Sequence, residues 1–80
     1  MKAYVYVTLK KSVLDPQGKT IQGALKKLGY SSVSDVRQGK YFELEIGGQD
    51  EQQAKSQVEK IAREVLTNPV IEEFTYRLEN

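Results

Sequence analysis

The spacing of apolar residues changes several times along this 80-residue chain, and the changes limit the folds open to it. In residues 3–9, apolar side chains alternate with tyrosine and threonine, and this period of two indicates a half-buried β-strand. In residues 16–28, apolar side chains recur three and four positions apart, as in an amphipathic α-helix. The chain therefore predicts a fold in which helices pack on a sheet.

The remaining segments continue the two patterns. Residues 40–47 predict a second strand, residues 51–66 a second helix and residues 70–78 a last strand. Residues 33–37 resemble a shorter strand, and Gln38-Gly39 is either a hairpin turn or a bend inside one long strand. We expect an α+β two-layer sandwich, with two helices on one face of a small sheet. Its order is βαββαβ, which is ferredoxin-like, or βαβαβ with a bent middle strand.

Composition limits the chemistry of the chain. Residues 1–80 have the length of a single domain, which has only a small core. Because the chain has no cysteine, it can form neither a disulfide nor a thiolate metal site. Because it has no histidine, it lacks the side chain that most often acts as a general base. The formal net charge of +1 does not indicate a nucleic-acid-binding protein. No run of apolar residues is long enough to cross a membrane. We expect a cytoplasmic protein that gains stability by self-association.

Gly18-Lys19-Thr20 resembles the end of a phosphate-binding loop, but the segment before it does not fit one. The position that needs the first glycine holds Val13, and Pro16 has no N–H to offer a phosphate. A helix start explains the segment better. The Asp15 carboxylate suits the N-cap, and proline suits the first helical position.

No set of residues suggests a catalytic site, a metal site or a cofactor site. Glu43 and Glu45 share a strand face but have the pattern of a solvated surface, and Glu72 and Glu73 point to opposite faces of a strand. None of the serines has a candidate base to activate it. We therefore expect a chain that is not catalytic alone.

Tyrosines mark the sheet face that the helices leave open. Tyr4 and Tyr6 point away from the apolar side of the first strand, and Tyr41 points the same way in the second. Tyrosine is enriched at protein interfaces, so these three residues are candidate interface residues. Arg37 and Lys40, on either side of Gly39, are candidates as well, because they suit an anion or an acidic partner.

Three segments resemble one family when taken together. VLDPQG at residues 13–18, VRQGK at residues 36–40 and NPVIE at residues 68–72 occur here in the order found in the PurS family. That family is the small subunit of phosphoribosylformylglycinamidine (FGAM) synthase. The resemblance covers essentially the whole chain and implies a PurS-like fold.

The resemblance also implies a function. In de novo purine biosynthesis, a synthetase subunit uses ATP and Mg to activate its substrate, and a glutaminase subunit supplies ammonia. The small subunit forms a homodimer or tetramer and holds the two enzymes together without binding a cofactor itself. The alternative is a ferredoxin-like regulatory module that senses a small metabolite between two protomers.

Overall fold

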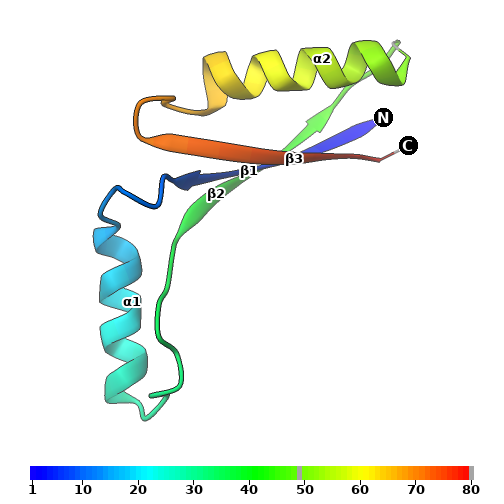
Figure 1. Ribbon diagram of the computed structural model, residues 1–80. Coiled ribbons are helices and arrows are strands. Elements are labelled where there is room, and N and C mark those ends of the chain that lie inside the picture. Colours follow the sequence, from blue (N-terminus) through cyan, green and yellow to red (C-terminus); the bar gives the residue numbers. More distant parts are fainter. Residues whose placement is uncertain (49, 80) are drawn as a thin grey trace.

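The computed structural model describes residues 1–48 and 50–79, which form an α+β fold around one three-stranded sheet. Its elements are β1 (Lys2–Leu9), α1 (Pro16–Lys27), β2 (Gly39–Glu45), α2 (Glu51–Ile61), the π-helical turn η1 (Ala62–Leu66) and β3 (Glu72–Glu79). Strand β1 lies in the centre and pairs antiparallel with β2 and with β3 (Figure 1). The α+β class is confirmed, and of the two expected orders the chain has βαβαβ.

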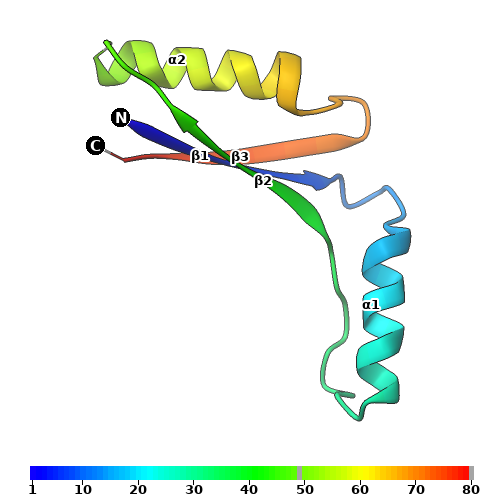
Figure 2. The ribbon, with the colours of Figure 1, turned by 180° about the vertical axis from the view of Figure 1, so that it is seen from behind.

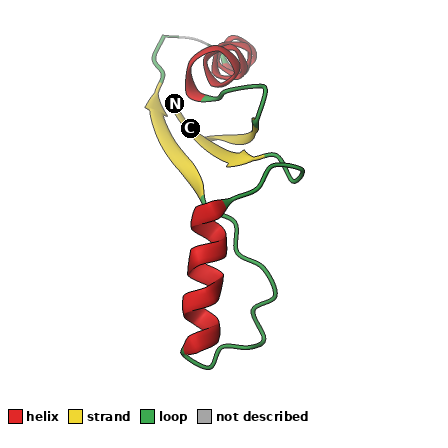
Figure 3. Ribbon diagram, turned by 90° about the vertical axis from the view of Figure 1, so that its left-hand side faces the viewer, coloured by secondary structure: helices red, strands yellow, loops and turns green. Residues whose placement is uncertain are grey.

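The core lies between α2 and one face of the sheet. Ala3, Val5 and Val7 of β1 are at most 1% exposed. Three small residues of the second helical segment are buried over the same face, namely Ala54, Val58 and Ala62. Partly buried side chains from the two outer strands complete this layer, among them Phe42, Leu44, Phe74, Tyr76 and Leu78. Figure 3 shows α2 on one side of the sheet, and no helix of the described residues covers the opposite face.

Residues 33–37 do not form the strand that their sequence suggested. They run as extended chain beside α1 and lead directly into β2, which begins at Gly39, so there is no hairpin. Within residues 1–48 and 50–79, no other strand lies alongside to pair with them. Their polar groups bond to α1 instead: the Gln22 side chain donates to the carbonyl of Ser34 at 2.7 Å. Apolar residues that alternate along the sequence predict an extended backbone. Such a segment becomes a β-strand only when it forms hydrogen bonds with a neighbouring strand.

Helix α1 occupies a different place from the one its apolar stripe suggested. It extends beyond the end of the sheet, whereas α2 lies along the sheet (Figures 1 and 2). Ile21 and Leu28 of the stripe are 40% and 74% exposed. The cause is local, because Gly18 in the first turn packs against the backbone of Val36 and so holds α1 beside residues 36–38. We call residues 10–38, which contain α1 and the extended segment, the arm.

The arm makes the single chain unusually long. The radius of gyration is 16.0 Å, and the molecule measures 50 × 27 × 14 Å. A compact domain of this length has a radius of gyration of about 12 Å. The excess shows that α1 contributes little to the core of its own chain.

Both helices begin at the predicted residues, whereas the segment that follows α2 differs from the prediction in its helical geometry and in where the last strand starts. Asp15 and Asp50 are the N-caps of α1 and α2, and Gly29 after α1 has a φ of 96°, the left-handed conformation that glycine adopts easily. The second helix widens into η1, where the Thr67 hydroxyl donates to the carbonyl of Ala62 at 2.8 Å. The last strand starts at Glu72, two residues later than expected, because Asn68 begins a turn there.

Candidate functional site

The open face of the sheet carries the tyrosines that the sequence pattern placed there. We call this surface the tyrosine face and define it by Tyr4, Tyr6 and Tyr41. Tyr6 lies directly opposite Tyr41 across the β1–β2 pair and opposite Thr75 across the β1–β3 pair. Because alternate residues of a strand share a face, charged side chains surround the tyrosines, namely Lys2, Glu43, Glu45, Glu73, Arg77 and Glu79.

The three rings form one packed cluster. The centroids of Tyr6 and Tyr41 are 5.2 Å apart, and those of Tyr4 and Tyr41 are 6.2 Å apart with nearly parallel planes. The guanidinium of Arg77 sits 4.7 Å above the ring of Tyr4, a cation–π contact. Partial burial, together with a 3.0 Å hydrogen bond to Glu43, raises the pKa of Tyr41 to about 12. The cluster is therefore a preformed, uncharged aromatic surface with a charged rim.

The three segments that carry the family resemblance meet at one junction, where the arm leaves the sheet. Asp15 in the first segment accepts a hydrogen bond from Gln38 N in the second, at 2.8 Å. Lys40 in the second pairs with Glu72 in the third, at 3.4 Å. Glu72 also accepts from Asn68 N at 2.7 Å, which fixes the turn before β3. These motifs therefore set the direction of the arm.

Asp15 caps α1 as predicted, and its carboxylate also binds the extended segment before β2. One carboxylate oxygen accepts from Gly18 N at 3.0 Å, as an N-cap does, and the other accepts from Gln38 N. The residue is only 4% exposed. The hydrogen bonds from Gln38 and Gly18, with a smaller contribution from the Arg37 charge, lower the pKa of this carboxyl group. Nothing near Asp15 in sequence revealed the second bond, because its donor lies 23 residues away.

Arg37 and Lys40 both have partners within the chain. One nitrogen of the Arg37 guanidinium donates to the carbonyls of Lys10, Val13 and Leu9, at 2.9, 3.2 and 3.3 Å. Arg37 therefore fastens the extended segment to the loop before α1. Lys40 points to the same sheet face as the core, since it lies opposite Val7. A contact of either residue with another protein stays a prediction.

We expect Asp15→Asn to lower the melting temperature by roughly 4–8 °C at neutral pH. Asparagine caps helices well, but it has one acceptor oxygen where two N–H groups need acceptors. A carboxyl group with a lowered pKa stabilises the fold above its unfolded value of 3.8, and this contribution disappears as the pH falls through the lower folded pKa. The deficit of the variant should therefore shrink as the pH falls below about 4.

Asp50→Asn is the matched control. Asp50 caps α2 with a single 2.8 Å bond from Gln53 N, and it is exposed. Asparagine supplies that one acceptor, so this variant should melt close to the wild-type temperature. Equal melting curves for the two variants would show that the bond between Asp15 and Gln38 contributes nothing.

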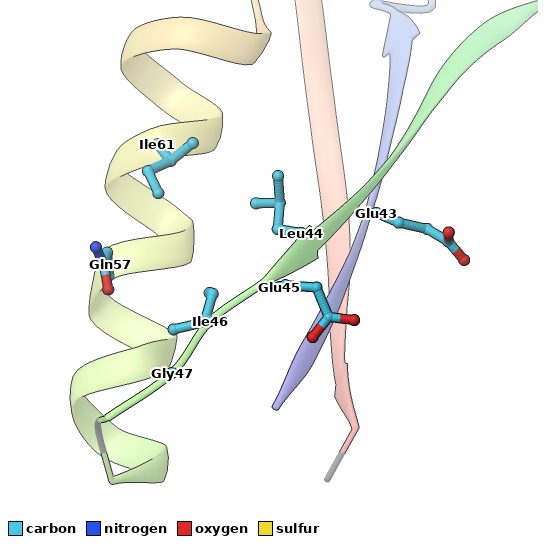
Figure 4. A pocket seen from close by; sticks show the side chains of 7 residues that line it. All are labelled: Glu43, Leu44, Glu45, Ile46, Gly47, Gln57 and Ile61. Atoms are coloured by element: carbon cyan, nitrogen blue, oxygen red, sulfur yellow. The ribbon is translucent and has the colours of Figure 1, made fainter.

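A shallow groove of about 350 Å³ lies between β2 and α2. Leu44 and Ile46 lie on the side of β2 nearer the helix, from which Gln57 and Ile61 complete the lining, whereas Glu43 points to the other side of the strand (Figure 4). The lining contains two glutamates and no basic residue. Such a lining disfavours the phosphates of nucleotide-like metabolites, which carry the same charge.

In the part of the chain that the structure describes, no three acidic, histidine or cysteine side chains gather in a way that suits a metal ion. Among residues 1–48 and 50–79, no helix is both long enough and apolar enough to span a bilayer.

Comparison with known families gives a match along nearly the whole chain. Residues 2–80 match the family model PurS, described as phosphoribosylformylglycinamidine (FGAM) synthase. The chain is 48% identical over 79 residues to the phosphoribosylformylglycinamidine synthase subunit PurS of Mycobacterium leprae, covering 99% of this chain and 96% of that protein. It is 46% identical over 78 residues to the subunit of the same name from Bacillus subtilis, covering 98% and 92%.

Solved structures agree with these matches. The structure of Bacillus subtilis PurS resembles the chain with a TM-score of 0.87 at 46% identity, covering 99% of this chain and 98% of that one. A chain in the structure of PurLQS from Thermotoga maritima gives a TM-score of 0.87 at 34% identity, covering 95% and 93%. The position of the arm is included in this agreement, since coverage of 99% leaves no room for an unmatched α1.

Proposed function

Since this chain belongs to the PurS family, we propose that it is the small, non-catalytic assembly subunit of phosphoribosylformylglycinamidine synthase in de novo purine biosynthesis. In this role it brings a glutaminase subunit and an ATP-dependent synthetase subunit together, so that ammonia released by the first reaches the second. The observation that carries the proposal is the likeness of 95% of the chain to a subunit of PurLQS.

The geometry of the chain suits assembly. An uncharged aromatic surface with a charged rim is a common composition for a protein contact, and the arm extends away from the core. We include self-association in the proposal, as a homodimer or tetramer in the cytoplasm. Tyr4, Tyr6 and Tyr41 are the proposed contact residues, and Arg37 and Lys40 act mainly by holding the junction. ATP and Mg belong to the synthetase subunit in this proposal, and this chain binds no cofactor.

The alternative, a module that senses a small metabolite, has weaker support. Its best site would be the groove between β2 and α2, whose lining has two glutamates and no basic residue, whereas the ligand of such a module usually carries phosphate. Calorimetry with purine intermediates separates the two functions, because the assembly subunit should release no heat of binding on its own.

Co-purification tests the proposed function directly. A tagged copy of this chain should recover both a glutaminase and a synthetase from an extract of its own organism, and the two should come at a fixed ratio. Recovery of neither protein, from an extract in which both are detected, would contradict the proposal. A tagged chain with the Gly18→Ala change, which disturbs the junction, is the negative control.

A further inference from the structure

Helix α1 has three sides with different surroundings. Its apolar stripe forms one side. A second side lies against the extended segment, to which the Gln22 side chain donates a hydrogen bond at the carbonyl of Ser34. The residues of the third side follow one another at intervals of four, three and one positions, which brings them together on a helix, namely Lys19, Gly23, Lys26 and Lys27. All four are exposed, and we call this surface the lysine face.

The lysines of this face have no acidic neighbour on the helix. Helix α1 contains no aspartate or glutamate, and the acidic residues of the arm, Asp15 and Asp35, accept hydrogen bonds from backbone N–H groups. Within residues 1–48 and 50–79, the ion pairs involve other cations, namely Lys2, Lys40 and Arg77. The positive charges of the lysine face are therefore available to another molecule.

Two residues of the lysine face are unfavourable for the helix itself. The helix dipole disfavours a cation in the first turn, where Lys19 lies. Glycine weakens a helix interior, and Gly23 does not have the positive φ that would call for glycine. A Cβ at Gly23 would meet no atom within 4 Å, so packing inside the chain does not require glycine either. The stability of the single chain therefore explains neither residue.

The arrangement of these residues indicates what kind of molecule could bind. Gly23 leaves a gap on the helix surface, with lysines about one turn before it and one turn after it. Such a gap lets a second chain come close to the helix backbone. Lys19 and Lys26 are seven residues apart, or about 10 Å along the helix, so the lysine face suits several carboxylates better than one.

Other anions fit this surface less well. The hollow beside α1, of about 350 Å³, contains none of these lysines, so they do not surround a pocket for a small phosphate compound. A long nucleic acid would also meet the acidic remainder of the chain. The arm has six basic and two acidic residues, a formal charge of +4, whereas the remainder has six basic and nine acidic residues, a formal charge of −3. An acidic protein surface that contacts only the arm avoids that repulsion.

We propose that the lysine face docks an acidic segment of a partner protein, with its carboxylates beside the lysines and its chain close to Gly23. This inference rests on the proposed function, in which the partners are the glutaminase and the synthetase, and it assigns the contact with one of them to the arm. The arm suits such a contact because the junction holds α1 clear of the sheet (Figure 1).

Binding of the full chain to each purified enzyme tests the role of charge. The triple change Lys19→Gln, Lys26→Gln and Lys27→Gln should raise the Kd for one of the two enzymes at least about tenfold at low salt. The difference from the wild type should largely vanish at about 0.5 M salt, because exposed charges are then screened. A matched control removes as many exposed charges from the second helical segment, in Lys55→Gln, Lys60→Gln and Arg63→Gln. It should bind both enzymes as the wild type does.

Gly23→Gln tests the close approach of the partner. Glutamine is a better helix former than glycine and its Cβ has room, so this variant should melt at or above the wild-type temperature. Its side chain fills the gap, so the Kd for the same enzyme should rise about tenfold, whereas Gly23→Ala, which adds one methyl group, should change it much less. A folding defect cannot produce this combination, because the chain becomes more stable while its binding becomes weaker.

Four results would overturn the inference. They are equal Kd values for the lysine variant and its control, a wild-type Kd for Gly23→Gln, a change in the sedimentation of the isolated lysine variant, and lysine-dependent binding to phosphatidylserine vesicles with no effect on either enzyme. The third result would assign the lysine face to contacts between copies, and the fourth to a membrane. If the wild-type chain binds neither enzyme, the proposed function fails. If it binds and the variants bind equally well, only this inference fails.

Discussion

Gly18→Ala should destabilise this protein strongly, whereas Gly23→Ala, five residues further along the same helix, should stabilise it. A Cβ at Gly18 would collide with the carbonyl oxygen of Val36 and come within 2.8 Å of the Asp15 carboxylate. Neither group can move without breaking the junction. Forcing extra volume into such a place typically costs about 1–3 kcal/mol, and more where the obstacle is backbone.

Gly23 is the matched control because it lies on the open side of α1. A Cβ there meets no atom within 4 Å. Alanine in an exposed helix interior is better than glycine by about 0.5–1 kcal/mol. Urea unfolding of the two variants measures both effects, and opposite signs are expected. Equal stability of Gly18→Ala and the wild type would show that α1 does not approach residue 36 as closely as the structure has it.

Tyr6→Lys should weaken self-association by more than an order of magnitude. Tyr6 is 42% exposed and sits at the centre of the tyrosine face, beside Tyr41. Loss of a central aromatic anchor commonly costs about 2 kcal/mol or more of binding free energy, which is about 30-fold in Kd. Sedimentation equilibrium at several concentrations gives the Kd.

Two variants control for this change. Tyr6→Phe keeps the ring and should associate nearly as the wild type does, because the Tyr6 hydroxyl makes no hydrogen bond in the described part of the chain. Lys55→Glu changes a charge on the exposed side of α2 and should have no effect. If Tyr6→Lys remains a dimer at the wild-type concentration, the contact does not involve the tyrosine face.

Local sequence patterns predicted the elements well, because periodicity and capping are local properties. The caps at Asp15 and Asp50, the stop at Gly29 and the burial of Val5 and Val7 all follow from residues within a few positions. The tyrosine face followed in the same way, since alternation along β1 and β2 decides which side chains share a face.

Local sequence patterns could not predict the position of the arm relative to the sheet. An apolar stripe indicates that α1 packs against another surface, but it does not indicate whether that surface belongs to the same chain. The deciding contacts join distant residues: Gly18 with Val36, Asp15 with Gln38, and Arg37 with the loop before α1. The same contacts explain why residues 33–37 are extended without being a strand, and why Arg37 is a structural residue.

If this chain couples a glutaminase to a synthetase, the rate of the assembled enzyme should depend on the chain for one nitrogen source and much less for the other. The synthetase and glutaminase subunits are assayed together for amidine formation, with and without this chain, using either glutamine or free ammonia. We predict that the glutamine-dependent rate requires the chain and falls at least tenfold in its absence, while the ammonia-dependent rate changes much less. A glutamine-dependent rate that is the same with and without the chain would show that the chain does not couple the two enzymes.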